Sequence, residues 1–353
     1  MELGADQALA WRLRRHELVN PAGLDAVALA GRLCGVQAQV PSAAELAVRI
    51  RQVEPEPGEI TRALTLDRTL VRMWAARGTL HLLPAGLAPS FVAAVGALRF
   101  WEKGSWQRGH GITAEELTKV LAALAEVLDH RLLSREELVA EVLDRVGSAR
   151  LREALGSGWG ALFKPAAYLG LLCHGPAEGN RVTFTSPVHW LPGWTVPDPE
   201  QAGPDLVRAY LRAFGPAGHD EFAQWLFRNG KPGLTKRWFA AVRPELTEVS
   251  VAGKPGFVLT EDLAELRETK PSKAVRLVPA FDQYVVAVSR ELIPEQHLAK
   301  VSRAAGWISP VVLHGGRVAG VWSRDNGVIS TELFAELPAR ALSAEIERVG
   351  ALF

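Results

Sequence analysis

The chain has few cysteines and no long apolar run. Only Cys34 and Cys173 occur among 353 residues, which excludes a disulfide framework and a CxxC metal or redox motif. No uninterrupted apolar run reaches about 18 residues, so no transmembrane helix is expected. The first 18 residues lack the basic-then-apolar layout of a secretory signal. We therefore expect a cytoplasmic protein without a membrane partner.

The signatures of several enzyme classes are missing as well. The sequence contains no HExxH, Walker A, GxSxG or EF-hand pattern. Gly156–Ala161 fits GxGxxA, but it follows a helical segment instead of a strand, which argues against a Rossmann nucleotide site. The nine histidines show no ligand spacing, and His81, His174 and His189 are interpreted as structural. Neither a metal nor a cofactor is predicted.

The charge balance is nearly neutral, with 40 basic and 39 acidic residues and a net charge of +1. Most of the basic residues are Arg, the side chain best suited to phosphate and base edges. Two stretches, 68–101 and 222–244, contain basic residues but no acid. They predict either a positive surface or ordinary solvated helix faces. Charge alone slightly favours the second interpretation.

Three segments of the chain repeat one order of elements, in which helices precede two strands. The order is typical of a winged helix-turn-helix motif. The first segment has predicted helices 9–17, 25–36, 43–51 and 59–66 and strands 70–75 and 79–83. The second has helices 114–129, 135–146 and 159–172 and a strand at 181–185; the third has helices 205–214, 220–228 and 234–242 and strands 247–251 and 257–260.

The rest of the chain predicts a linker and a β-rich region. Four prolines between residues 192 and 204 indicate a linker. Beyond residue 270, strands are expected at 275–278, 284–288, 311–313, 318–322 and 328–331, with a helix at 338–350. The predicted fold class is α+β, with three tandem winged helix-turn-helix motifs and a small β-rich C-terminal region. The predicted boundaries are 1–110, 111–192, 193–270 and 271–353.

The segment Gly35–Pro41 contains two glutamines two residues apart. Pro41 disfavours a helical conformation at Val40, so the preceding helix is expected to end near this point. In an extended segment, residues two apart lie on the same face, and Gln37 and Gln39 would project side by side. Two amides can hold a water or a sugar-phosphate group. Spacing alone favours the alternative, two solvated polar residues at a helix end.

Four motifs give the chain a resemblance to a known family. They are Val36–Gln39, Arg77–Leu83, Leu277–Tyr284 and Val312–Val318. Together they span almost the whole chain, and they resemble the AlkZ/YcaQ family of bacterial winged-helix DNA glycosylases. The Gln-X-Gln form resembles the AlkZ branch, whereas the YcaQ branch has Gln-X-Asp. This branch implies self-resistance to a DNA-alkylating antibiotic such as azinomycin B.

The resemblance implies a fold, an activity and a partner. The three winged-helix motifs would form a C-shaped concave channel for double-stranded DNA that carries alkylated or crosslinked purines. The implied enzyme is a monofunctional DNA glycosylase that hydrolyses the N-glycosidic bond of N7-alkylated purines and unhooks interstrand crosslinks. Gln37 and Gln39 would be its catalytic residues. We expect a monomer, because one chain already supplies three modules.

The remaining site predictions concern basic residues and one hairpin. His81 and Arg77 are expected to line the active site, although a core histidine is the alternative for His81. Phosphate contacts are expected from Arg68, Arg72, Arg77, Lys231, Lys236 and Arg237. The turn His314-Gly315-Gly316-Arg317 predicts a hairpin that enters the DNA or, equally, an ordinary surface hairpin. The alternative function is a non-catalytic winged-helix transcription regulator.

Overall fold

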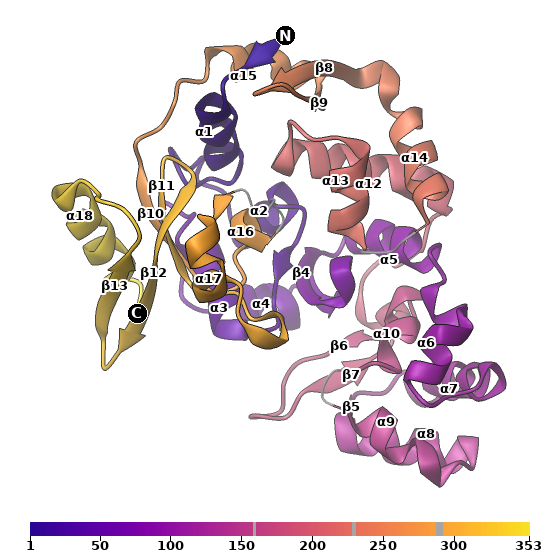
Figure 1. Cartoon of the computed structure of the whole chain (residues 1–353). Coiled ribbons are helices and arrows are strands. Elements are labelled where there is room, and N and C mark those ends of the chain that lie inside the picture. Colours follow the sequence, from indigo (N-terminus) through magenta and orange to yellow (C-terminus); the bar gives the residue numbers. More distant parts are fainter. Residues whose placement is uncertain (158–159, 228–230, 287–291) are drawn as a thin grey trace. The chain divides into compact units, whose positions relative to one another are not determined.

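The computed structural model describes residues 1–157, 160–227, 231–286 and 292–353 (Figure 1). They form a mixed α+β protein with two compact units, which confirms the predicted class. Unit 1 comprises Met1–Pro57, Arg208–Phe222 and Val242–Phe353, and unit 2 comprises Gly58–Val207 and Ala223–Ala241. The predicted four-part division does not coincide with these units and stays a prediction about motifs. None of the described helices is long and apolar enough to cross a membrane.

Unit 1 contains the N-terminal helices and the C-terminal sheet. Its helices are α1 (Ala5–Arg15), α2 (Ala26–Arg32), α3 (Pro41–Arg49), α15 (Leu263–Glu268), α16 (Gln283–Val286), α17 (Leu298–Val301) and α18 (Ala339–Gly350). Its strands are β1 (Glu2–Leu3), β2 (Val36–Gln37), β8 (Leu246–Val251), β9 (Lys254–Leu259), β10 (Val275–Val278), β11 (Val311–His314), β12 (Arg317–Asp325) and β13 (Val328–Leu333).

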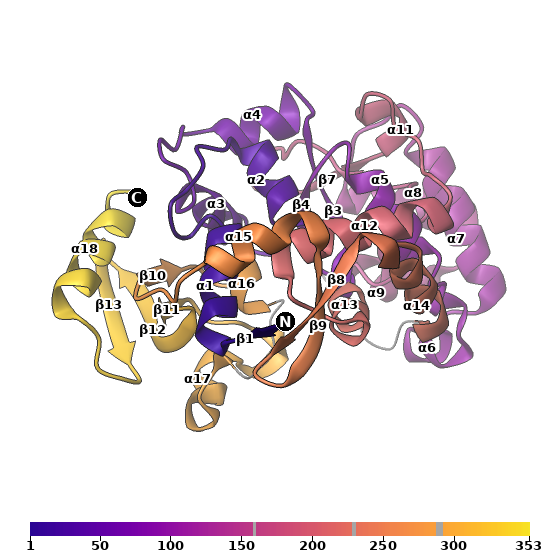
Figure 2. The same ribbon diagram turned by 90° about the horizontal axis from the view of Figure 1, so that it is seen from above.

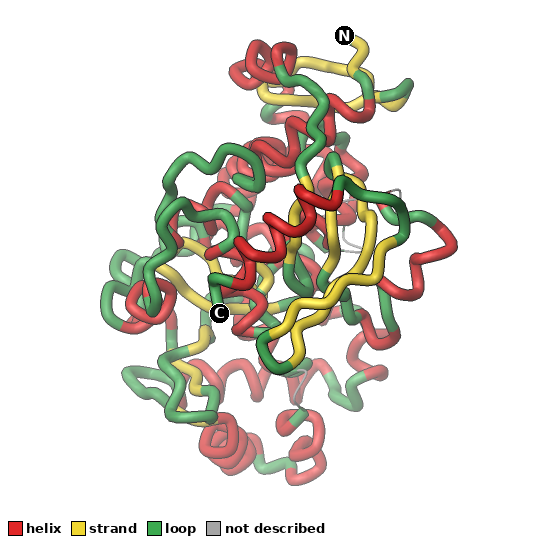
Figure 3. The backbone as a smooth tube through the Cα atoms, turned by 90° about the vertical axis from the view of Figure 1, so that its left-hand side faces the viewer, coloured by secondary structure: helices red, strands yellow, loops and turns green. Residues whose placement is uncertain are grey.

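The C-terminal sheet has the antiparallel order β10-β11-β12-β13, so the predicted β-rich region is confirmed. Helix α18 lies across it, and β12 and β13 form the long hairpin of Figure 3. Val311, Val312 and Leu313 are fully buried beneath Leu9 and Leu13 of α1 in one apolar core. Burial of such side chains contributes about 1.5–3 kcal/mol each relative to exposure.

A second, small sheet of unit 1 pairs the N-terminal residues with a hairpin about 250 positions further along the chain. Strand β1 pairs in parallel with β8, which forms an antiparallel hairpin with β9 (Figure 2). Leu3 and Trp11 pack with Val249 and Val258 of this hairpin. The hairpin was predicted around Gly253, whereas β1, with two residues, is too short to be recognised from its sequence pattern.

Unit 2 consists of helices packed around a third sheet. Its helices are α4 (Glu59–Thr65), α5 (Ala88–Gly96), α6 (Gly104–Gly109), α7 (Ala114–Val127), α8 (Arg135–Val146), α9 (Arg152–Gly156), α10 (Phe163–Tyr168), α11 (Pro187–Trp190) and α14 (Pro232–Ala241). Its strands are β3 (Leu70–Trp74), β4 (Leu80–Pro84), β5 (Leu133–Ser134), β6 (Cys173–His174) and β7 (Thr183–Thr185). They lie in the order β4-β3-β6-β7-β5. Helices α12 (Pro199–Phe214) and α13 (His219–Leu226) contain residues of both units.

The N-termini of α7 and α8 follow from their capping residues. Thr113 and Ser134 each accept a hydrogen bond from the backbone three residues later, and Glu116 and Glu137 bond back to the cap. Such reciprocal capping boxes satisfy two backbone donors that a helix start leaves without partners. Both boxes were predicted from their spacing, and α8 has the predicted bounds.

A helix, a linker and a strand are among the predicted elements that differ from the structure. The predicted helix 159–172 is reduced to α10, because Gly170 adopts φ 73° and terminates the helix in a left-handed turn; residue 159 lies outside the described residues. The predicted linker 192–204 ends at Pro199, where α12 begins. Pro204 lies inside α12, whose buried face, including Leu206 and Tyr210, outweighs one missing backbone donor.

The predicted strand 284–288 is wrong for its described part, which forms the helical turn α16. Asp282 is the cause, because its carboxylate accepts the Tyr284 N–H at 2.9 Å and its carbonyl accepts from Val285 and Val286. This local bonding competes with a strand. Residues 287 and 288 lie outside the described residues.

Asp282 also forms a buried ion pair with Arg51. The two side chains are fully buried and make two hydrogen bonds, of 2.7 and 2.8 Å. Arg51 donates further bonds to the carbonyls of His16 and Ala47, at 2.8 and 2.7 Å. The pair therefore connects the end of α1, the end of α3 and the start of α16. A buried pair whose polar atoms are all used contributes order to a core, although its net stability is small.

We expect Asp282→Ala to lower the free energy of unfolding by about 3–5 kcal/mol, because it leaves a buried guanidinium without its partner. Urea unfolding followed by circular dichroism measures the change. The double variant Arg51→Met/Asp282→Leu removes both charges and should recover most of the loss. A single variant as stable as the parent would contradict this account.

Candidate active site

Gln37 and Gln39 lie together in unit 1. The Gln37 amide nitrogen donates a hydrogen bond of 2.8 Å to the Gln39 side-chain oxygen. Gln37 is only 5 % exposed, whereas Gln39 is half-buried. Gln37 ends β2, the chain bends at Gln39, and Val40 is extended (φ −111°, ψ 105°) before α3; the hydrogen bond between the two amides shows that their side chains lie next to each other. The predicted side-by-side geometry is thus present in the structure.

The turn before the pair is set by the end of α2. This helix ends at Arg32, four residues before the predicted end, because Cys34 (φ 53°) and Gly35 (φ 93°) are left-handed. Gly35 N–H bonds to the Ala30 carbonyl and Cys34 N–H to the Gly31 carbonyl, which is a Schellman motif. A helix that ends here leaves room for an extended segment before Pro41 starts α3.

The side chain of Gln283 also contacts this turn. Its amide nitrogen donates a hydrogen bond of 2.7 Å to the carbonyl of Gly35, two residues before Gln37. The Gln283 side chain is 2 % exposed and adjoins Asp282, which is fixed by Arg51. A chain of contacts therefore runs from the buried ion pair to the glutamine segment. Sequence reasoning did not assign Gln283 a role, although it lies in the Leu277–Tyr284 motif.

Two neighbouring carboxamides provide hydrogen-bonding groups without charge. The mutual bond uses one donor of Gln37 and one acceptor site of Gln39. The amide nitrogen of Gln39 is a separate donor group that can be directed at a water or a sugar oxygen. An amide is too weak a base to remove a proton from water outright, so its contribution is orientation of the water.

Arg77 and His81 lie together in unit 2, at the turn between β3 and β4. Arg77 is left-handed (φ 57°), as its place in this tight turn requires. Its guanidinium lies 3.4 Å from the His81 Nε2 and donates to the Trp225 carbonyl at 3.2 Å. The His81 Nδ1 lies 3.0 Å from the Thr79 carbonyl. A carbonyl only accepts, so Nδ1 carries the proton and Nε2 accepts from Arg77.

His81 is completely buried, as the core-histidine alternative expects. Burial, followed by the charge of Arg77, lowers its pKa to about 3, so the imidazole is neutral at physiological pH. Its predicted role of lining the active site stays a prediction.

Two predicted phosphate ligands, Arg68 and Arg72, lie elsewhere in unit 2. The Arg68 guanidinium stacks on the Trp190 ring, 4.1 Å from its centroid. Arg72 is half-buried on β3, opposite His174 of β6, and burial lowers its pKa.

Two further cations, Arg135 and Lys164, were not singled out from the sequence, and burial lowers their pKa values as well. Arg135 begins α8 and lies over the Phe163 and Phe184 rings. No sequence pattern could have shown that these cations are half-buried, because the rings that cover Arg135 come from other elements.

The other predicted phosphate ligands belong to α14 and the loop before it. Lys231 and Arg237 line a pocket of about 630 Å³, and Lys236 is exposed. Asp198 and Glu200 line the same pocket, and Glu200 pairs with Arg237 at 2.6 Å. The stretch 222–244 contains no acidic residue in the sequence, but in the structure Asp198 and Glu200 lie beside its basic residues.

The hairpin between β11 and β12 is present as predicted. Gly315 and Gly316 have φ values of 58° and 88°, as a tight two-residue turn needs. Its tip is anchored, however. The Tyr284 hydroxyl donates to the Gly316 carbonyl at 2.9 Å, and a Cβ on Gly316 would lie 2.5 Å from that hydroxyl. Arg317 is exposed and pairs with Asp6 at 2.9 Å, while His314 is half-buried. DNA contact by this hairpin stays a prediction.

Comparison with known proteins identifies the class of enzyme. A family model described as "DNA glycosylase AlkZ-like" matches residues 30–352. The protein is thus a DNA glycosylase, a hydrolase that acts on N-glycosyl bonds. A chain of Streptomyces sahachiroi named "Interstrand DNA cross-link repair glycosylase" is 41% identical over 356 residues, which cover 97% of this chain and 95% of the relative.

A solved structure gives the same result. It is described as "Streptomyces sahachiroi DNA glycosylase AlkZ", and it matches with a TM-score of 0.92 and 38% identity over 99% of this chain and 98% of the other. The chain belongs to the AlkZ-like family, and the resemblance seen in its motifs is confirmed. Membership of an enzyme family decides against the alternative of a non-catalytic regulator.

The neutral state of His81 makes stability depend on pH. Its pKa is about 3 in the folded state and about 6.5 in an unfolded chain, so below pH 6.5 only the unfolded state takes up the proton. Between pH 6 and pH 5, His81 should lower the free energy of unfolding by about 1.2 kcal/mol. Urea unfolding at both pH values should show a loss that is smaller in His81→Asn by about this amount, because His16 and His174 contribute to the loss in both proteins and the Asn amide can still donate to Thr79. Equal losses in both proteins would refute the assignment.

Proposed function

We propose that this protein is a monofunctional DNA glycosylase that releases N7-alkylated purines and unhooks interstrand DNA crosslinks. Its role would be self-resistance to a DNA-alkylating antibiotic such as azinomycin B. The observation that carries the proposal is the hydrogen-bonded pair Gln37 and Gln39 in a chain of the AlkZ-like family. The name of the Streptomyces sahachiroi relative, an interstrand cross-link repair glycosylase, supports the choice of substrate.

The chemistry of an N7-alkylated purine suits an uncharged site. Alkylation at N7 places a positive charge on the ring, so the base leaves as a neutral molecule when the N-glycosidic bond breaks. The electron pair of that bond neutralises the ring, and no acid has to protonate the leaving group. A water then adds to the C1′ carbon of the sugar and releases its proton to solvent. Gln37 and Gln39 would orient this water.

Substrate selectivity follows from the same arrangement. A carboxylate base typically contributes about 10²–10⁴-fold to a rate, and the amide pair forgoes most of this. An undamaged base is a poor leaving group and would need that contribution. The site therefore favours destabilised, cationic purines. No step through a covalent lysine adduct is proposed, so strand cleavage is left to other enzymes.

The DNA interface is proposed from the fold of the family. Three winged-helix motifs would form a C-shaped channel along duplex DNA, and one chain would act as a monomer. A crosslinked base is tied to the opposite strand and cannot be extruded freely into a closed pocket, as many glycosylases require. An open site approached along the groove avoids this difficulty. Arg68, Arg72 and Lys236 supply candidate phosphate contacts, and the β11–β12 hairpin is a candidate DNA probe.

The decisive experiment uses a duplex with one N7-methylguanine. Incubation with the protein, followed by alkali and a denaturing gel, detects each abasic site as a strand break. We expect breaks only after alkali treatment. Breaks without alkali would contradict a monofunctional enzyme, and none in either sample would contradict the proposed function. A duplex with an N7-linked interstrand crosslink tests unhooking in the same gel.

Gln37→Ala and Gln39→Ala should each slow base release by about 10²-fold, because misplacement of the attacking water by an ångström can cost that much. The single-turnover rate on the N7-methylguanine duplex measures the effect. Gln39→Glu is the matched control, since its carboxylate can still accept the Gln37 bond and orient a water; it should stay closer to the parent than Gln39→Ala. Duplex binding, followed by fluorescence anisotropy, should survive in all three. Parental rates in both alanine variants would remove the proposed roles.

Gln283→Leu should reduce the single-turnover rate about tenfold, because it removes the donor that fixes the Gly35 carbonyl while filling similar space. Gln283 is a positioning residue here, so the dissociation constant for duplex DNA should not change. Thermal unfolding provides the control for folding. A parental rate in a folded variant would show that the turn before Gln37 needs no such support.

A further inference from the structure

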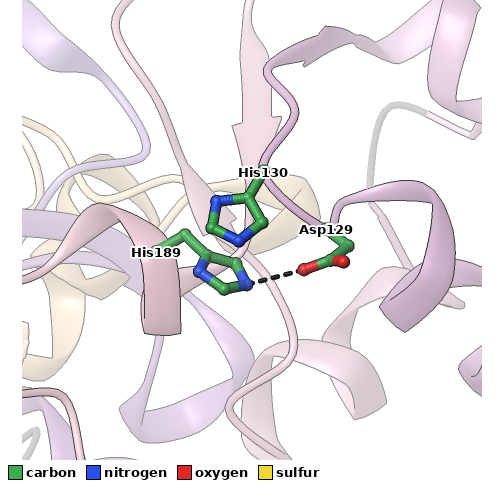
Figure 4. Close-up of side chains that lie close together, drawn as sticks. All are labelled: Asp129, His130 and His189. Atoms are coloured by element: carbon green, nitrogen blue, oxygen red, sulfur yellow. Dashed lines mark ion pairs between the residues drawn. The ribbon is translucent and has the colours of Figure 1, made fainter.

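Three side chains with metal-binding atoms meet on the surface of unit 2. Asp129, His130 and His189 each offer one ligand atom, and these atoms all lie within 4.8 Å of one another (Figure 4). The His189 Nε2 lies 2.6 Å from an Asp129 carboxylate oxygen, and the centroids of the two imidazole rings are 3.5 Å apart. The cluster is separate from Gln37 and Gln39, which belong to unit 1.

The sheet of unit 2 brings these residues together. Strand β5 pairs antiparallel with β7 in the register Leu133↔Phe184 and Ser134↔Thr183. Beyond these pairs the register stops, because residues 128–130 form a turn and α11 (Pro187–Trp190) is helical. The Thr185 hydroxyl donates to the Arg131 carbonyl at 2.9 Å, so the two segments stay side by side past the last strand pair. The cluster lies just beyond this paired backbone, in the turn after α7 and in α11.

Local turns direct the side chains. His130 is left-handed (φ 51°) in the turn that follows α7, and His189 lies in the single-turn helix α11. All three residues are exposed, so their side chains can rotate. Zinc bonds of about 2.0–2.2 Å to nitrogen and oxygen require ligand atoms about 3.3 Å apart in a tetrahedron, which needs side-chain movements of about an ångström.

We propose that Asp129, His130 and His189 form a zinc site in which water is the fourth ligand. Two imidazoles and one carboxylate are a ligand set that suits zinc, whereas magnesium and calcium prefer oxygen ligands alone. The ion replaces the hydrogen bond between His189 and Asp129 and connects the turn after α7 to α11. It is a structural clamp, because the site lies on an exposed surface and includes no substrate-binding group.

The clamp acts on a residue of the predicted DNA interface. Trp190, which follows His189 in α11, stacks beneath the Arg68 guanidinium and accepts from it through its carbonyl at 3.5 Å. A four-residue helix has little stability of its own. Zinc bound by His189 therefore fixes α11 and, through Trp190, the place of Arg68.

Equilibrium dialysis of the full-length, tag-free protein with Zn²⁺ tests the proposal. We expect about one zinc per chain, measured by mass spectrometry of the metal, and a rise in the thermal unfolding temperature on addition of zinc. His130→Asn/His189→Asn should abolish both effects, and Asp129→Asn should weaken zinc binding by more than about tenfold. Excess Mg²⁺ should not displace the zinc. Cys34 and Cys173 are buried and do not compete for the ion.

His110→Asn is the matched control, because His110 lies in the same unit against Trp106 and outside the cluster. It should bind zinc like the parent. The proposal is overturned if the parent binds no zinc, or if the double variant binds it equally. A change in unfolding temperature caused by Asp129→Asn alone, with no response of the parent to zinc, would identify the cluster as an ordinary ion pair and also overturn the proposal.

Discussion

The ion pair of Arg51 and Asp282 organises unit 1. Two charges without contact to water are tolerated only when their hydrogen-bonding capacity is used. Here Arg51 donates to the carbonyls of His16 and Ala47, and Asp282 accepts from the Tyr284 N–H. The two carbonyls lie at the ends of α1 and α3, and the bonds of Asp282 make the chain after it a helical turn. Because Gln283 is the next residue, the same pair fixes the amide that holds Gly35. The buried ion pair thereby helps to hold the segment that contains Gln37 and Gln39 in place.

The glutamine segment shows how a helix end can create a site. Cys34 accepts a left-handed conformation that costs a non-glycine residue roughly 1–2 kcal/mol, and in return α2 stops before the glutamines. A helix continued through residue 36 would have turned Gln37 and Gln39 away from each other. The strain is confined to Cys34, and the early end of α2 lets the Gln37 and Gln39 amides lie next to each other. A buried thiol at position 34 is consistent with packing as its role.

The sequence predicted those features that depend on neighbouring residues. Capping boxes set the start of α7 and α8, and glycine pairs set the β11–β12 hairpin, because each pattern acts within a few residues. The errors arose where distant contacts decide. Asp282, whose bonds to the chain after it replace the predicted strand with a helical turn, is held by Arg51, 231 positions away, and Glu200 neutralises Arg237 from another helix. Asp129, His130 and His189 meet because the pairing of β5 with β7 brings their two segments together, so their spacing in the sequence did not indicate a cluster.

The chemistry of carboxamides has one more consequence for this enzyme. Glutamine side chains do not ionise in water, so a site built on them lacks the acidic and basic limbs that give most glycosidic enzymes a bell-shaped response to acidity. In the proposed mechanism the chemical step would therefore have nearly the same rate in mildly acidic and in mildly alkaline solution. The limit under acid stress then comes from the scaffold, where buried imidazoles such as those of His16, His81 and His174 take up protons only when the protein opens.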